Sequence, residues 1–197
     1  TLDEMASGVL PIAIGAATKM IPFIEMVRPQ TKEYEFSLKF GFETDTLDMA
    51  GREIVRTDII PSYDSVVDAL GTLVGDIEQV PPIYSAVHLG GRRAYDLART
   101  GVAIDMPARR VRIDSVELLN INGDEWTFRT RCGRGTYVRA IARDIANGCG
   151  TVATVTMIRR TENVGFTVKD TVKLDFLENL FNNGGDFGQY LKPIDFG

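Results

Sequence analysis

The sequence predicts an α+β fold whose core is a mixed, mostly antiparallel sheet flanked by helices. Segments with strand patterns outnumber segments with helix patterns, and two of the strands are joined as a hairpin by a tight turn. Strands and helices do not alternate regularly and the sequence contains no internal repeat, which excludes a parallel βαβ fold and a repeat array. A chain of 197 residues is long enough to bury a core, and we expect residues 1–197 to form one domain.

The chain opens on an acidic loop followed by an apolar run. Asp3 precedes three small residues, and we expect residues 9–14 to form a buried strand behind it. A short helix is expected over residues 16–25, interrupted near Pro22. A carboxylate held next to rigid structure is well placed for chemistry. The alternative is that Asp3 only caps a turn, which is the commoner role of an aspartate in such a position.

A strand, an acidic loop and a helix follow. Residues 31–40 alternate between apolar and polar side chains, which predicts a half-buried strand with Tyr34 on its apolar face. Residues 44–51 form the acidic loop, and Ser62 is placed to cap the helix after it. The apolar stripe of this helix consists of Val66, Val67, Leu70 and Leu73.

The hairpin lies in the second half of the chain. Residues 110–121 and 126–132 both alternate, and the turn 122–124 joins them. Thr136 is then expected to cap a helix over residues 137–146, which carries an apolar stripe of its own.

A buried strand and a final helix complete the expected elements. The β-branched run over residues 151–158 predicts the strand, and residues 174–181 predict the helix. Arg159 and Arg160 come directly after the expected strand. Two interpretations are open for them: a charge pair that protects a sheet edge, or cations that bind a phosphate backbone.

The composition excludes several classes of protein. Hydrophobic residues make up 44% and charged residues 25% of the chain, as in ordinary globular proteins, and no apolar run is long enough to span a bilayer. Two cysteines and one histidine are too few for a four-ligand zinc site without carboxylates, so we expect no metal. Reduced, buried thiols fit a cytoplasmic protein better than a disulfide does.

The distribution of charge is more informative than the net charge of −5. Residues 41–78 contain nine acidic and two basic side chains, whereas residues 129–143 contain five arginines and no acids. Residues 88–113 contain six arginines and two acids. A basic cleft on an acidic body attracts a phosphate backbone through its local field. The same pattern also fits solvated faces of helices and strands, and both interpretations stay open here.

Two further segments combine aromatic and basic side chains. Residues 79–99 form an arm that adjacent prolines keep out of a helix, and they interleave Tyr84 with several cations, which suits RNA. The alternative is a surface Ω-loop. Tyr137 and Arg139 lie at a strand-to-helix junction, where a ring can pack on a planar ligand and a guanidinium can bind a carboxylate or phosphate. The alternative there is one core tyrosine and one solvated arginine.

Together these segments resemble the bacterial TruB-type tRNA pseudouridine-55 synthases over nearly the whole chain. The resemblance is carried by LDEMASGVLPIAIGAATK (2–19), KEYEF (32–36), TDTLDMAG (44–51), EQVPPIYSAVHLGGRRAYDLARTG (78–101), CGRGTYVRAIARDIA (132–146) and MIRRTENVGF (157–166). It implies the pseudouridine synthase fold, with residues 79–101 as a mobile thumb arm that closes over RNA. It also implies isomerisation of uridine 55 in the T-loop of tRNA without a cofactor, by a cytoplasmic monomer that needs no membrane or protein partner.

The resemblance also implies roles for individual residues. Asp3 matches the catalytic aspartate and Arg139 the arginine that pairs with it. Tyr34 matches the tyrosine that packs on the flipped base, Tyr137 a neighbouring active-site tyrosine, and Ile158 an apolar residue that contacts the base. We expect further contacts with the RNA backbone from His88, Arg92, Arg93, Arg99, Arg159 and Arg160.

The chemistry fits these residues independently. Conversion of uridine to pseudouridine breaks the N1–C1′ bond and joins C5 to C1′, so nothing is oxidised and no redox cofactor is required. An ionised carboxylate is required, and a nearby arginine favours the ionised form of an aspartate. Attack of Asp3 at C1′, attack at C6 and action as a base all remain open.

The sequence departs from the family pattern at two residues and at both ends. Glu4 stands where the family usually has proline, and His88 where it usually has lysine. The family's basic N-terminal lead-in and its C-terminal PUA-like domain are expected outside residues 1–197.

Three alternative functions are left. The first is an RNA-binding or tRNA-folding module without activity, and the second is a guide-RNA-dependent synthase of the dyskerin type. The third, a glycosidase that uses Asp3 and Glu4, is disfavoured because adjacent loop carboxylates do not oppose each other across a bond.

Overall fold

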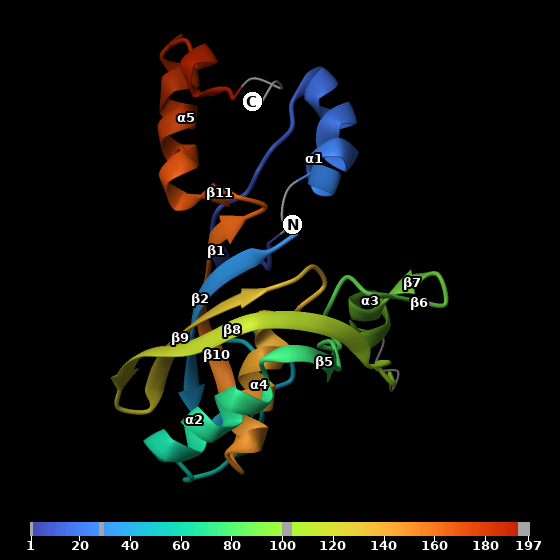
Figure 1. The fold of residues 1–197 in the computed structure, drawn as a ribbon, viewed down its shortest axis with the longest axis vertical. Coiled ribbons are helices and arrows are strands. Elements are labelled where there is room, and N and C mark those ends of the chain that lie inside the picture. Colours follow the sequence, from blue (N-terminus) through green and yellow to red (C-terminus); the bar gives the residue numbers. More distant parts are fainter. Residues whose placement is uncertain (1, 28–29, 100–103, 193–197) are drawn as a thin grey trace.

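A computed structural model describes residues 2–27, 30–99 and 104–192 of the chain (Figure 1). Its strands are β1 (Ala6–Gly8), β2 (Lys32–Phe40), β3 (Phe42–Thr44), β4 (Glu53–Arg56), β5 (Gly75–Gln79), β6 (His88–Leu89), β7 (Arg92–Arg93), β8 (Arg109–Asn122), β9 (Glu125–Cys132), β10 (Ala153–Asn163) and β11 (Phe166–Thr167). Its α-helices are α1 (Ile21–Val27), α2 (Tyr63–Thr72), α3 (Ala94–Arg99), α4 (Val138–Gly148) and α5 (Leu174–Asn182). Short 3₁₀ helices are η1 (Gly15–Met20), η2 (Val168–Asp170) and η3 (Gly188–Tyr190).

The main sheet has the strand order β1-β10-β2-β9-β8-β5, and β11 pairs with β10. The β1–β10 pair is parallel and the other pairs of this sheet are antiparallel, which confirms the expected mixed, mostly antiparallel sheet. Two small hairpins, β3–β4 and β6–β7, lie outside it.

The core lies between the sheet and the helices α2 and α4, which Figure 1 shows together below it. Phe36, Leu38 and Phe40 of β2 are buried on the inner face, as their alternation predicts. Ser62 caps α2 by accepting a hydrogen bond from the backbone of Ser65, as expected. Val67 is the one member of the expected stripe that is exposed.

Helix α4 begins at Val138, one residue later than expected. The residue before its first turn is Tyr137, and no side chain caps the helix there. The cap expected from Thr136 is therefore wrong. Most of the helix is buried, including Arg139, because it packs between the sheet and α2.

The strand expected over residues 9–14 is wrong. The strand in this part of the chain is β1, which ends at Gly8, before the apolar run begins. In the run itself Val9 is buried, whereas Leu10, Ile12 and Ile14 are exposed. Gly8 has a φ of 102°, and a side chain there would overlap the carbonyl oxygen of Arg160. Beyond it the ladder stops, because Pro11 has no N–H to donate.

Strand β10 extends five residues past its expected end at Ile158. Arg160 therefore falls inside the strand, on the same buried face as Ile158, and its side chain is only 1% exposed. Its Nε donates a hydrogen bond of 2.8 Å to the carbonyl oxygen of Val9. The guanidinium of Arg160 is thus turned into the protein in this structure, and its contact with the RNA backbone stays a prediction. Arg159 points the other way and is exposed.

Two parts of the chain lie away from the core. The expected first helix is present as η1 followed by α1, which stands with α5 at the end of the molecule opposite α2 and α4 (Figure 1). The arm, with β6, β7 and α3, projects to one side, and its Val87 and Ala94 form a small apolar cluster with Met106, which follows the arm in the chain. Residues 100 and 101 of the expected arm lie outside the described residues. No described helix is both long and apolar enough to cross a membrane.

Candidate active site

The structure brings Asp3 and Arg139 together, although 135 residues separate them in the chain. Arg139 donates one hydrogen bond of 2.9 Å from Nε to Asp3 Oδ2 and another of 3.2 Å from Nη2 to Asp3 Oδ1. The Arg139 side chain is 6% exposed, whereas that of Asp3 is 36% exposed. The expected contact is confirmed, and it presents a fixed carboxylate to an open side of the protein.

Asp3 is positioned by the short strand that follows it. The backbone N–H of Ala6 donates a hydrogen bond of 2.9 Å to the carbonyl of Asp3, which closes a turn. Ala6 then pairs with Ile158 in the parallel β1–β10 ladder. The carboxylate is thus attached to the central sheet through one turn and three paired residues.

Arg139 binds two other segments besides the Asp3 loop. Its Nη1 donates a hydrogen bond of 2.8 Å to the carbonyl of Thr46 and lies 3.3 Å from Oδ2 of Asp48. Its Nη2 also donates a hydrogen bond of 3.0 Å to the carbonyl of Tyr84, at the base of the arm. One buried guanidinium therefore holds the N-terminal loop, the acidic loop and the arm in fixed relative positions.

Asp48 was not among the residues expected at the site, because residues 44–51 were interpreted as an acidic loop and as one of the segments that carry the family resemblance. Oδ1 of Asp48 accepts hydrogen bonds from Thr46 Oγ1 at 2.7 Å and from the backbone N–H of Ala50 at 3.0 Å. The carboxylate is fixed within its own loop, with its other oxygen turned to Arg139. The threonines beside Asp48 in the quoted TDTLDMAG segment were the available signal, because hydroxyls often orient a carboxylate.

Tyr34 and Ile158 lie on the same face of the sheet. Tyr34 pairs with Arg160, and Ile158 pairs with Phe36 two residues along the ladder. Burial raises the pKa of the Tyr34 phenol, a hydrogen bond with Arg160 partly opposes this, and the Asp3 carboxylate adds a smaller increase. Tyr34 is therefore a neutral phenol within electrostatic reach of Asp3.

Tyr137 takes a different position. Its ring packs against the apolar cluster of the arm rather than with Tyr34 and Ile158 in the main core. The arm residues His88, Arg92, Arg93 and Arg99 are exposed, and His88 pairs with Arg93 in the small hairpin. The ring of Tyr95 lies 5.4 Å from the guanidinium of Arg99.

Several arginines of the basic stretch 129–143 already form ion pairs with acidic side chains of the protein. Arg129 forms an ion pair of 2.7 Å with Glu35 of the neighbouring strand, and Arg131 forms one of 2.9 Å with Glu162. Arg143 is paired with Asp144 at 2.8 Å. Glu35 and Glu162 lie on other strands, so the charges within residues 129–143 alone do not predict these ion pairs.

No described residues form a cluster of three or more histidine, cysteine or acidic side chains that could hold a metal ion. Both cysteines are free thiols. Burial raises the pKa of Cys132 to about 11 and also raises that of Cys149. Neither thiol is therefore a reactive thiolate at neutral pH.

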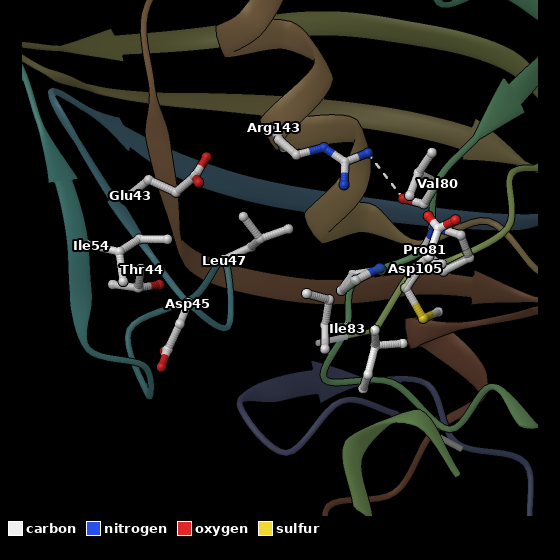
Figure 2. Close-up of a pocket in the computed structure, with 13 residues that line it drawn as sticks. Glu43, Thr44, Asp45, Leu47, Ile54, Val80, Pro81, Ile83, Asp105 and Arg143 are labelled. Atoms are coloured by element: carbon white, nitrogen blue, oxygen red, sulfur yellow. Dashed lines mark hydrogen bonds between the residues drawn. The ribbon is translucent and has the colours of Figure 1, made fainter. Parts of the chain in front are cut away.

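A pocket of about 380 Å³ lies beside the site, between the β3–β4 hairpin and the base of the arm (Figure 2). Its walls are mostly apolar, and Glu43 and Arg143 are among the charged groups. Burial raises the pKa of Glu43, which Arg143 partly counteracts. Asp3, Tyr34, Tyr137, Arg139 and Ile158 do not line this pocket.

Comparison with solved structures defines the class of fold. The described chain superposes on a Cbf5–Nop10–Gar1 complex with a TM-score of 0.68 at 23% identity, covering 98% of this chain and 50% of the other. A structure of an H/ACA RNP bound to a substrate RNA containing 2′-deoxyuridine gives a TM-score of 0.65 at 22% identity, with 98% and 48% coverage. The fold is the pseudouridine synthase fold.

Sequence comparison then gives the family. Residues 1–138 match the model of the TruB family pseudouridylate synthase N-terminal domain, and the chain belongs to that family. Curated relatives named tRNA pseudouridine synthase B include those of Gluconacetobacter diazotrophicus, 46% identical over 195 residues, and Caulobacter vibrioides, 41% identical over 181 residues. The matches cover 98% and 91% of this chain but 63% and 57% of these relatives, so the chain spans about three fifths of their length.

Proposed function

We propose that this chain is the catalytic part of a tRNA pseudouridine synthase, which converts uridine 55 of the T-loop to pseudouridine. The observation that carries the proposal is the Asp3–Arg139 pair, a half-open carboxylate held by a buried guanidinium. Membership of the TruB family and the names of the curated relatives support the same reaction.

The reaction requires one ionised carboxylate and no external reagent. The N1–C1′ bond breaks, the uracil ring turns, C5 bonds to C1′, and the proton lost from C5 is balanced by one gained at N1. Attack of Asp3 at C1′, attack at C6 and removal of a proton all use the same ionised oxygen. Arg139 donates a hydrogen bond to each oxygen of the Asp3 carboxylate and so fixes its direction.

Tyr34 and Ile158 provide the surfaces for the base. Both lie on the inner face of the sheet, and Ile158 pairs with Ala6, three residues after Asp3. A uridine that leaves its stack loses a few kcal/mol, and packing against aromatic and apolar side chains offsets that loss. Stacking on an aromatic ring contributes about 1–3 kcal/mol per base. In this proposal the uracil packs against both Tyr34 and Ile158, which lie on the same face of the sheet.

In this proposal the arm binds the phosphate backbone of the RNA. His88, Arg92, Arg93 and Arg99 are exposed on it, and Arg159 is exposed on β10. Cations on a projecting arm that is joined to the site through Tyr84 and Arg139 can bind phosphates while the arm closes. We propose that Tyr137 contacts the RNA next to the arm, because its ring packs against Val87, Ala94 and Met106.

In this proposal the protein acts as a cytoplasmic monomer and needs no cofactor or guide RNA.

The test is site-resolved detection of pseudouridine in tRNA. An unmodified tRNA transcript is incubated with the 197-residue chain, digested, and analysed by mass spectrometry after derivatisation of pseudouridine. One pseudouridine is expected, at position 55, and none in a transcript with cytidine at that position. Binding of tRNA without conversion would favour the RNA-binding module instead. Conversion only after addition of guide RNA would favour the guide-dependent class.

A further inference from the structure

The base of the arm is held to α4 at three points. Gln79 is hydrogen-bonded to Tyr137, and Arg143 Nη2 donates a bond of 3.0 Å to the carbonyl of Val80. Arg139 donates to the carbonyl of Tyr84. Figure 2 shows the Arg143–Val80 bond above the pocket. All three contacts join a side chain to main-chain atoms, and of the three only Gln79 binds both the N–H and the carbonyl of the same residue.

Gln79 is the last residue of β5, where the chain leaves the sheet and the arm begins. Its backbone is part of the β5–β8 ladder, opposite Arg109. Its side chain is 1% exposed, which is rare for an uncharged polar group unless it is fully hydrogen-bonded. Gln79 Oε1 accepts a bond of 2.9 Å from the N–H of Tyr137, and Gln79 Nε2 donates one of 3.3 Å to its carbonyl.

Both bonds involve the backbone of the residue immediately before α4. The side chain of Tyr137 makes no capping hydrogen bond, and its carbonyl also accepts the first bonds within the helix, from Ala140 and Ile141. The Gln79 amide thus pairs with Tyr137 as a neighbouring strand would, and fixes the height and rotation of the helix start. Arg139 follows two residues later, so the direction of its side chain depends on that rotation.

We propose that Gln79 is a positioning residue that sets the start of α4, and through it the orientation of Arg139 toward Asp3. The inference deepens the proposed function and rests on it for its kinetic consequence. Gln79 does not contact the substrate in this proposal. An amide suits this place because it offers a donor and an acceptor at one end, as the backbone of Tyr137 requires.

The kinetic test uses Gln79→Met, which keeps the length of the side chain and removes both polar groups. The N–H of Tyr137 loses its partner, and we expect kcat on tRNA to fall roughly 10- to 100-fold, as for a misplaced catalytic group. KM should stay within about threefold, because no phosphate contact is removed. The matched control is Thr151→Val, which removes a partly buried hydrogen bond of 2.7 Å to the carbonyl of Ile59 near the other end of α4. Its kcat should equal that of the wild type.

A second measurement does not depend on activity. The Nε–H signal of Arg139, assigned through its loss in Arg139→Lys, should be protected from exchange with water in the wild type because it is bonded to Asp3. In Gln79→Met that signal should broaden or exchange at least about tenfold faster, and in Thr151→Val it should not change. A wild-type signal in Gln79→Met overturns the proposal, and so does a wild-type kcat. Absence of turnover in the wild type, with the expected change of the signal, contradicts the proposed function and leaves the positioning role supported.

Discussion

Arg139 holds Asp3 through two hydrogen bonds while its own guanidinium is nearly inaccessible to solvent. The cation is buried and also faces Asp48, so it is surrounded by protein partners, whereas the carboxylate it orients stays partly open. This division suits a site in which the carboxylate reacts and the arginine does not. It also makes the two residues sensitive to different substitutions.

Replacement of Arg139 by lysine should remove the fork geometry while keeping the charge. A lysine cannot make the two parallel bonds to Asp3 together with those to Thr46 and Tyr84. We expect kcat to fall at least about 100-fold. The free energy of unfolding should drop by about 1–3 kcal/mol, because the buried carbonyls bound by the guanidinium lose hydrogen bonds. Single-turnover kinetics and urea denaturation measure the two effects.

The control for that substitution is Arg110→Lys on β8. Arg110 is exposed and pairs with Asp76 only at 3.6 Å. Its replacement should change the free energy of unfolding by less than about 1 kcal/mol. If the two substitutions changed kcat and the free energy of unfolding equally, the role given to the hydrogen bonds of Arg139 would be contradicted.

Asp48→Asn should lower kcat without weakening tRNA binding. Asparagine keeps an oxygen for Thr46 and Ala50 but loses the negative charge that faces Arg139 at 3.3 Å. Loss of one such buried charge pair should lower kcat roughly tenfold or more. Asp45→Asn, in the same loop, is the control, because Asp45 bonds the backbone of Arg52 and does not contact Arg139. A lowered kcat in the control alone would contradict the role given to Asp48.

Ionisation of Tyr34 should lower the free energy of unfolding at alkaline pH. Its pKa is raised in the folded state by burial, so folding favours the protonated phenol. The corresponding stability is present below the unfolded pKa of 10.0 and is lost as pH rises through the higher folded value. Tyr34→Phe should therefore reduce the loss of unfolding free energy between about pH 9 and about pH 11.

The control for the alkaline experiment is the exposed Tyr63, which starts α2. Urea denaturation of Tyr63→Phe should show the same pH dependence as the wild type. An identical pH dependence for Tyr34→Phe and the wild type would contradict the burial of a neutral phenol at this place.

The arm cations should determine how strongly tRNA binding depends on salt. Arg92 and Arg93 are exposed on β7, away from the Asp3 site. If each neutralises one phosphate, the combined Arg92→Gln and Arg93→Gln substitution should reduce the slope of log K against log salt by about 2. Filter binding over a range of salt concentrations measures this slope. Arg56→Gln on β4 should leave it unchanged, and an unchanged slope in the arm variant would remove the arm from the RNA interface.

Elements with a local signal were predicted well from the sequence. The alternation of β2, the hairpin β8–β9 and the Ser62 cap of α2 depend on residues that are neighbours in the chain. The pairing of Asp3 with Arg139 was also expected, but from the resemblance to a family rather than from any local pattern.

Features that depend on distant partners were not predicted. The apolar run after Val9 reads as a strand, yet β1 precedes it because the pairing partner is β10, about 150 residues away. Arg160 reads as a surface cation, yet its strand continues and buries it against Val9. Gln79 carried no signal of its own and Asp48 only a weak one from its neighbouring threonines, since their roles depend on Tyr137 just before α4 and on Arg139 within it.

The most direct test compares the wild type with Asp3→Asn in conversion of uridine 55 and in tRNA binding. Asparagine removes the ionised oxygen and no phosphate contact, so conversion should be abolished while Kd stays within about tenfold. Pseudouridine is measured at single-nucleotide resolution under single-turnover conditions, with saturating protein. A stable Kd with no product is the predicted result. Formation of pseudouridine at position 55 by purified Asp3→Asn would contradict the assignment of Asp3 as the reacting carboxylate.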